Sequence, residues 1–176
     1  MNIIDENQAI EQTLAIYSQK LDTISDEYFK QSPPGGGWSF AEVYSHILKA
    51  TLGCTVTIEK CSNNNVAATN KGATFFGWYV MLLGVFPPIK VKVPAAIAAK
   101  IPAEKMSIEE AKLMIDKCKK RLGTVLPLLG NASPDSKIKH PRLGMLNAQQ
   151  WFKFTRIHAQ HHLAQLDRIE RKIKKF

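Results

Sequence analysis

Two histidines near the carboxyl end of the sequence have the spacing best suited to chemistry. His158 and His162 are four residues apart, so on an α-helix their rings lie on one face, about 6 Å apart along the axis. Two neutral imidazoles in this arrangement can bind one ion, and imidazole suits zinc, copper, iron and nickel. Gln165 follows about one turn later. It can orient a ligand or a water molecule, or it can be an amide that packs between helices.

The segment that carries this pair has the periodicity of an amphipathic helix. With a turn of about 100° per residue, both histidines fall on an apolar stripe about 120° wide, and His161 falls at its margin. The other members of the stripe are Trp151, Phe154, Thr155, Gln165, Leu166, Ile169 and Ile173. Two polar rings on a buried stripe are costly unless a partner satisfies them. The pattern leaves open whether this partner is a metal ion or a hydrogen-bonding group of the core.

A third histidine, His46, lies early in another predicted helix. This helix begins at a capping box, in which Ser39 and Glu42 can satisfy each other's backbone amides. His46 falls at the edge of the apolar face, a position that by itself is typical of a structural histidine. His140 lies in a segment rich in proline and glycine, where we expect an exposed side chain.

Four segments have helical periodicity and predict an all-α fold. They cover residues 5–30, 39–62, 107–129 and 147–174. Asp5 is the predicted N-cap of the first, and a second capping box, Ser107 with Glu110, begins the third. Amphipathic helices without convincing strands favour an antiparallel four-helix bundle. With 176 residues the chain fits one domain that spans residues 1–176.

A long irregular connection is expected between the second and third of these helices. Residues 66–103 are rich in aromatic and aliphatic residues and contain four prolines. We expect a short helix near residues 77–85, then an extended segment, then one turn near residues 95–100. The connection is too apolar to be a solvated loop, so it packs over the bundle, lines a pocket or meets a partner subunit.

The composition limits the classes of function. The net charge is +9, from 24 Lys and Arg against 15 Asp and Glu, but the basic residues are spread along the chain, which favours a solvated surface over a nucleic-acid site. The longest apolar run, residues 73–86, is shorter than the ~20 residues that a membrane-spanning helix needs. The amino terminus has no signal-peptide pattern, and Cys54, Cys61 and Cys118 are an odd number of cysteines. We therefore expect a cytoplasmic protein with reduced thiols.

The order of these motifs resembles the DinB-like superfamily. The shared pattern runs Trp38-Ser39-x-x-Glu42-x-x-x-His46 and, far along the chain, His158-x-x-x-His162-x-x-Gln165. Two further segments are similar to an uncharacterised branch of that superfamily. They are Gly36-Gly37-Trp38-Ser39 and His140-Pro141-Arg142-Leu143-Gly144. The resemblance covers most of the chain and is weakest in the middle segment.

The resemblance implies a four-helix bundle in which His46, His158 and His162 hold a divalent metal ion, with zinc or nickel favoured. It also implies a homodimer. In some members it implies transfer of a low-molecular-weight thiol such as bacillithiol, mycothiol or glutathione. No nucleic-acid role is carried over, because this bundle is not a DNA-reading fold.

Three hypotheses about function follow. The first is a metal-dependent enzyme, a thiol S-transferase or hydrolase acting on a small molecule, because three protein ligands leave a coordination position open. Gln165 and His161 would act beyond the ligands, and no Asp or Glu occupies a motif position as a general base. The second is a non-enzymatic, metal-stabilised bundle that binds a ligand or partner. The third, ranked below both, is association of residues 73–86 with a membrane surface beside Lys90 and Lys92.

Overall fold

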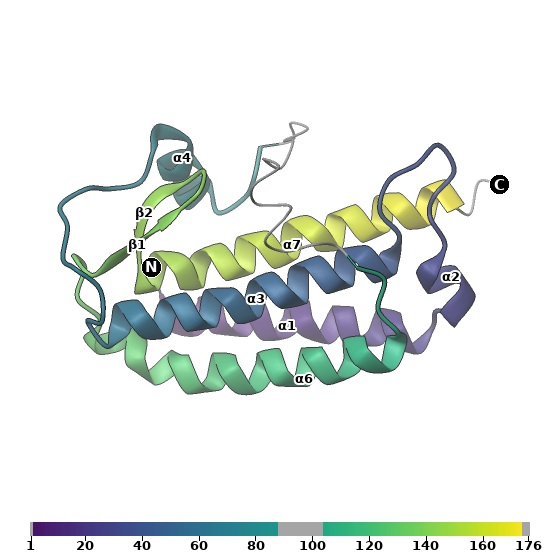
Figure 1. Cartoon of the computed structure of the whole chain (residues 1–176), viewed down its shortest axis with the longest axis horizontal. Helices are drawn as coiled ribbons and strands as arrows, with labels where there is room; N and C mark the ends of the chain where they lie inside the picture. Colours follow the sequence, from purple (N-terminus) through teal and green to yellow (C-terminus); the bar gives the residue numbers. More distant parts are fainter. Residues whose placement is uncertain (1, 88–103, 174–176) are drawn as a thin grey trace.

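Four long helices pack side by side around one hydrophobic core (Figure 1). The computed structural model describes residues 2–87 and 104–173. The long helices are α1 (Ile3–Asp22), α3 (Phe40–Ser62), α6 (Ile108–Val125) and α7 (Ala148–Ile173). Their buried faces meet in the core, so the predicted all-α four-helix bundle is confirmed.

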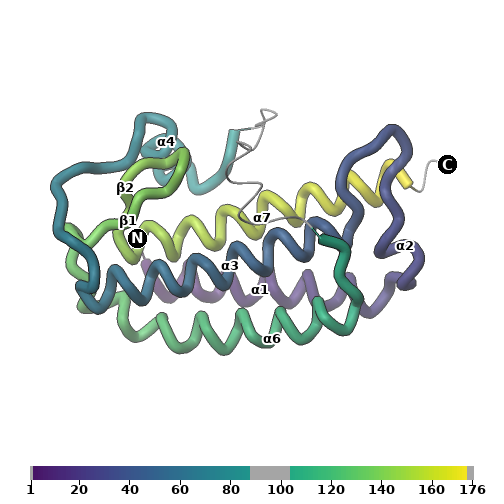
Figure 2. Tube along the Cα trace, in the orientation of Figure 1, coloured from purple at the N-terminus to yellow at the C-terminus, as the bar shows by residue number. Residues whose placement is uncertain are grey.

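The helices do not simply alternate in direction, as the tube in Figure 2 shows. The residue numbers of contacting pairs rise together along α3 and α6. The Cys118 thiol donates to the Leu48 carbonyl, and further along both helices Arg121 pairs with Glu59. These two neighbours are therefore parallel, and the expectation of an antiparallel bundle is wrong for this pair. The connection of residues 63–107 is long enough to return along the bundle, so α6 begins at the same end as α3.

Capping boxes fix where two of the long helices begin. The boxes predicted at Ser39 and Ser107 are both present. In each, the serine side chain accepts from the amide three residues on, and the glutamate there accepts from the serine amide. The Ser39 box sets the start of α3, and with it the position of His46 two turns into the helix.

The first predicted helix is two helices in the structure. α1 ends at Asp22, and α2 (Asp26–Lys30) begins after a short break. The N-cap of α2 is Ser25, whose side chain accepts from the amide three residues on at 3.3 Å. This local hydrogen bond competes with a continuous helix, so the prediction of a single helix is wrong. The N-cap of α1 is Asn2 rather than Asp5.

A short β-hairpin precedes α7. Strands β1 (Lys137–His140) and β2 (Gly144–Asn147) pair antiparallel, which corrects the expectation that the chain has no strands. Each strand has four residues, too few for a period-two pattern to stand out. Gly144 has a φ of 85°, which favours glycine at the end of the turn. A 3₁₀-helix, η1 (Leu126–Asn131), follows α6 directly.

A short helix, α4 (Phe75–Leu83), lies against the hairpin (Figure 1). It confirms the expected short helix, which begins two residues earlier than predicted. The Thr74 amide donates to the Leu143 carbonyl at 2.8 Å and joins the start of α4 to the hairpin. The expected extended segment and the turn near residues 95–100 fall mainly on residues 88–103, outside the described residues. Of the described part of the connection, Phe86 packs on the α7 side chains His158 and His161. Among the described helices, none combines the length and hydrophobicity needed to cross a bilayer.

Replacing Gly77 with Ala is expected to lower the free energy of unfolding by about 1–3 kcal/mol, as overpacking does. A Cβ at Gly77 would lie 2.1 Å from the Leu143 carbonyl oxygen, which is backbone and cannot swing aside. Gly53→Ala is the matched control, because a Cβ there meets nothing within 4 Å and a helical Gly→Ala change adds stability. Urea unfolding measures both. Equal stabilities would contradict the close contact of α4 with the hairpin.

The cysteines are packing residues. All three are buried and unpaired, in agreement with the expectation of reduced thiols. Burial raises the pKa of the Cys54 and Cys118 thiols to about 12. Both are therefore protonated at neutral pH and are poor nucleophiles.

Candidate metal centre

Three histidines from two helices converge inside the bundle. His46 belongs to α3, and His158 and His162 belong to α7. One ring nitrogen of each lies within 4.8 Å of the other two, and Nε2 of His158 is 3.0 Å from Nε2 of His162. The structure therefore brings together the three residues that the sequence singled out, and their nitrogens could share one ion.

Hydrogen bonds between helices set the register of this group. The Tyr17 hydroxyl of α1 donates to the Ala159 carbonyl of α7 at 2.9 Å, and the Tyr44 hydroxyl of α3 donates to the Tyr17 carbonyl at 2.8 Å. Both phenols are buried, and their rings meet edge to face at 5.1 Å. Tyr44 lies two residues before His46, and Ala159 directly follows His158. The tyrosine bridge thus holds the two sides of the histidine group in register.

Gln165 orients the His162 ring. Its side-chain oxygen lies 2.8 Å from Nδ1 of His162, and because an amide oxygen can only accept, Nδ1 carries the proton. The lone pair of the ring is then on Nε2, which faces Nε2 of His158. Gln165 therefore lies behind His162, where a residue that orients a ligand is expected.

The chemistry of the three rings suits a metal ion. Burial and the neighbouring rings lower the pKa of His158 well below its usual range and that of His162 to about 3. Burial also lowers the pKa of His46. All three rings are therefore neutral at pH 7 and keep a lone pair for coordination. Nδ1 of His46 is buried and finds no hydrogen-bond partner among the described residues. An unsatisfied polar atom of this kind costs about 1–3 kcal/mol.

Aromatic rings surround the histidines. Trp38 stacks on His162, with 15° between the ring planes and 6.4 Å between centroids. Phe154 stacks on His158 at 5.1 Å, and Phe86 meets the same ring edge to face at 6.4 Å. An apolar surround of this kind limits the access of water and keeps the local dielectric constant low.

His161 lies beside the group and is not part of it. Its ring centroid is 5.2 Å from that of His162 and 5.1 Å from that of Phe86. Burial and the nearby Arg168 lower the pKa of His161. Within the described part of the chain, no Asp or Glu joins the three-histidine group. Because His161 lies at the site without belonging to the group of candidate ligands, its imidazole is the titratable side chain that could exchange a proton with a bound molecule.

His140 is half-buried, which corrects the expectation of an exposed side chain. Its ring packs against Trp151 and Phe154, with centroids 5.3 and 4.6 Å away. Nδ1 accepts from the amides of Arg142 and Leu143 at 3.2 and 3.1 Å and closes the turn of the hairpin. Burial and the charge of Arg142 lower the pKa of His140 to about 4. The side chain is thus a structural part of the hairpin.

Trp38 and Phe86 are side chains of the site that the sequence did not assign to it. Trp38 lies just before Ser39, the N-cap of α3, and His46 lies two turns into that helix. This spacing is a signal in the sequence that could have indicated the contact between the Trp38 and His46 rings. Phe86 lies three residues after the end of α4 and belongs to the apolar connection. No local pattern distinguishes it from the other aromatic residues there, because its place at the site depends on how α4 docks.

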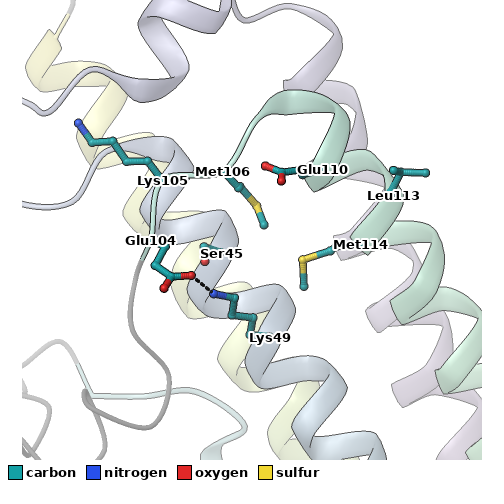
Figure 3. Close-up of a pocket in the computed structure, with 8 residues that line it drawn as sticks. All are labelled: Ser45, Lys49, Glu104, Lys105, Met106, Glu110, Leu113 and Met114. Carbon is teal, nitrogen blue, oxygen red and sulfur yellow. Dashed lines mark hydrogen bonds and ion pairs between the residues drawn. The ribbon is translucent and has the colours of Figure 1, made fainter.

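A hollow that the histidines do not line lies between α3 and α6 (Figure 3). It has a volume of about 380 Å³. Its lining residues are Ser45, Lys49, Glu104, Lys105, Met106, Glu110, Leu113 and Met114. Lys49 and Glu104 form an ion pair of 2.8 Å at its edge. None of the candidate histidines lines it, so the hollow is not part of the candidate metal centre.

Solved structures share this fold. TT2238, described as a four-helix bundle protein, has a TM-score of 0.56 and 16% identity, with 94% of this chain and 95% of that chain covered. YfiT from Bacillus subtilis, described as a probable metal-dependent hydrolase with an unusual four-helix bundle topology, has a TM-score of 0.64 and 14% identity, with 98% and 87% covered. A mycothiol-dependent maleylpyruvate isomerase has a TM-score of 0.62 and 10% identity, with 94% of this chain but only 61% of that chain covered.

The sequence itself identifies the family. A comparison with curated proteins gave no match. The sequence model of the DinB superfamily, in contrast, matches residues 9–166, a range that contains all three histidines of the site. The chain belongs to the DinB superfamily.

Proposed function

We propose that His46, His158 and His162 bind a divalent metal ion, with zinc or nickel favoured, and that the chain is a metal-dependent enzyme acting on a small molecule. The reaction classes we propose are transfer of a thiol to an electrophile and hydrolysis. The observation that carries the proposal is the convergence within 4.8 Å of three neutral imidazoles, two of them buried and that of His158 half-buried. Three protein ligands are typical of catalytic sites, because they leave a coordination position for substrate or water.

The residues of the site have separate roles in this proposal. The three histidines would hold the ion, which would supply a lowered pKa for a bound water molecule or thiol. Gln165 keeps the proton of His162 on Nδ1, so that Nε2 stays available. Trp38 and Phe86 pack on the histidines and shield the site from bulk water. His161 accepts or delivers the proton that the reaction moves, at a ring nitrogen.

Two proteins with similar folds suggest which reactions to test. One is described as a probable metal-dependent hydrolase, and another as a mycothiol-dependent isomerase, which uses a thiol. A low-molecular-weight thiol is therefore the co-substrate that we propose to test first. We also propose that the chain works in the cytoplasm as a homodimer and binds no nucleic acid.

Turnover after metal removal and reconstitution tests the enzyme proposal. The purified chain is stripped with a chelator and reloaded with zinc or nickel. It is then given a thiol with an electrophilic acceptor, and separately a panel of esters and amides. We expect activity that depends on the metal and is lost in His158→Ala. Activity that survives both the chelator and His158→Ala would contradict the proposal.

The second candidate function is a metal-stabilised bundle that binds a ligand without turning it over. The observation in its favour is that no carboxylate of the described residues accompanies the histidines as a general base. Stoichiometric metal, no turnover across the panel, and a melting temperature that falls with chelator would favour this second function.

Replacing Gln165 with Leu is expected to weaken metal affinity by about 10–100-fold, as loss of a group that orients a ligand does. The variant leaves Nδ1–H of the buried His162 without its 2.8 Å acceptor. Gln160→Leu is the matched control on the same helix, because Gln160 pairs with Arg156 rather than with a histidine. Competition with a chromophoric chelator measures both affinities. A Gln165→Leu protein with unchanged affinity would show that the amide only packs.

A further inference from the structure

The side chains of α4 leave a large apolar surface exposed. Phe75 is 83% exposed, Trp78 55% and Leu82 62%, and α4 contains no charged residue. The helix docks on the hairpin through the opposite face, where Gly77 and Val80 are buried. The Phe75 and Trp78 rings stack with centroids 6.2 Å apart. Exposed apolar side chains gathered on one helix in this way are typical of an interaction site.

The two sequence ranges that contain α4 and the hairpin hold no acidic residue. Residues 60–103 hold five Lys and no Asp or Glu, and residues 136–166 hold five Lys and Arg and no Asp or Glu. All 15 acidic residues of the chain therefore lie outside these two ranges. The first range contains α4, and the second contains the hairpin and most of α7. The charge of the chain is thus unevenly distributed.

Cations lie on the segments that join α4 to the hairpin. Arg142 in the turn of the hairpin lies over the Phe76 ring of α4 at 5.6 Å. Lys71, just before α4, and Lys139, on β1, are exposed, and backbone hydrogen bonds join Gly72 and Thr74 to the hairpin. Figure 1 shows α4 and the hairpin on the side of the bundle opposite α6. Among the described residues, Asp135 and Glu6 lie outside the two ranges and pair with basic residues inside them, Lys137 and Arg156.

We propose that α4 docks on the surface of an anionic lipid bilayer. The exposed aromatic and leucine side chains of α4 would enter the boundary between headgroups and acyl chains, while Lys71 and Lys139 would lie against the anionic headgroups. Such docking needs no spanning helix and does not depend on the metal centre. The membrane-docking proposal is therefore independent of the proposed function and is tested separately from it.

The charges favour a lipid surface over two other occupants. A second copy docked on this face by a two-fold axis would bring two sets of cations together. Residues 60–103 and 136–166 contain no carboxylate that could neutralise the repulsion between them. A nucleic-acid site would be polar and strongly basic at its centre. Here the centre is apolar, and the cations lie around it.

Co-sedimentation of the full chain with vesicles tests the proposal. One set of vesicles contains phosphatidylcholine alone, and the other contains phosphatidylcholine with phosphatidylglycerol. We expect binding to the anionic vesicles that weakens with salt, and little binding to the neutral ones. Phe75→Ser with Leu82→Ser should lower the bound-to-free ratio at least about tenfold. Leu113→Ser is the matched control, because Leu113 is 70% exposed on α6.

Variants that remove a positive charge provide a second, independent test of binding to anionic vesicles. Lys71→Gln and Lys139→Gln should each weaken binding to anionic vesicles about fivefold, the effect of about 1 kcal/mol per basic residue near the surface. Lys119→Gln on α6 should leave binding unchanged. The substituted residues are all exposed, so thermal unfolding should show that every variant is folded. Three results would overturn the proposal: no preference for anionic vesicles, equal binding by the α4 variant and its control, or a dimer that the α4 variant dissociates while vesicles bind no protein.

Discussion

Replacing any one of His46, His158 and His162 with Ala is expected to reduce the bound metal from about one ion per chain to almost none. Each histidine supplies one of only three nitrogens in the group, and no carboxylate of the described residues can take its place. The two remaining imidazoles would form a weak site from which dialysis removes the ion. Elemental analysis of the purified variants beside the unsubstituted chain measures the loss.

His161→Ala is the matched control for this experiment. Its ring lies 5.2 Å from that of His162 on the same helix, but it is outside the group, so its metal content should equal that of the unsubstituted chain. Full metal content in His46→Ala would contradict the three-histidine site and leave at most the pair on α7. An unsubstituted chain that binds neither zinc nor nickel after reconstitution would remove the metal centre altogether.

Thermal unfolding separates loss of the site from loss of the fold. An ion that binds only the folded chain stabilises it by about 2.7 kcal/mol when its free concentration is 100 times the dissociation constant. Chelator should therefore lower the melting temperature of the unsubstituted chain and leave that of His158→Ala unchanged. The far-ultraviolet circular dichroism of both should match, because the bundle is held by the apolar core rather than by the ion.

The local parts of the fold could be predicted from the sequence. Capping boxes depend on residues three apart, so the starts of α3 and α6 were correct. The start of α7, predicted at residue 147, has a similar local signal. The Asn147 side chain accepts from the Gln150 amide at 2.9 Å, and the Gln150 side chain accepts from the Asn147 amide at 3.0 Å. An Asn-x-x-Gln pattern thus marks the boundary between β2 and α7.

The features set by distant parts of the chain could not be predicted. The parallel arrangement of α3 and α6 depends on where the connection of residues 63–107 returns, and amphipathic stripes do not encode this direction. The hairpin is stabilised partly from outside: the Met145 amide donates to the Gly72 carbonyl at 3.0 Å. A four-residue strand that gains its partners in this way leaves little trace in its own sequence.

The residues of the candidate site also differ in whether local sequence or tertiary packing brings them to the site. The pair on α7 was predicted from the helical period alone, because both rings lie on one face of one helix. That His46 joins them depends on tertiary packing, and only the resemblance to the superfamily indicated it. The ring contacts of Trp38 and Phe86 combine three separate elements, so they required the structure.

Lowering the pH from 6.5 to about 4 is expected to reduce the free energy of unfolding of the metal-free chain by about 3 kcal/mol through His140 alone. The folded pKa of His140 is about 4, against 6.5 for an ordinary histidine. Between these two values the unfolded chain binds a proton at this site and the folded chain does not, so acid favours unfolding. Protonation of Nδ1 would also remove the acceptor of the Arg142 and Leu143 amides.

His140→Asn isolates this contribution, because an amide oxygen can accept from the same two backbone amides and does not titrate. The smaller side chain loses ring contacts with Trp151 and Phe154, so the variant should be less stable at neutral pH but less sensitive to acid. Urea unfolding in the presence of chelator, at pH values on both sides of 6.5, measures the two profiles. The other histidines are common to both proteins, and His158 alone among those near the site has a pKa that the charge of His140 also lowers. Parallel profiles would contradict a His140 that stays neutral inside the folded chain, since a ring that titrates equally in the folded and unfolded states adds no pH dependence.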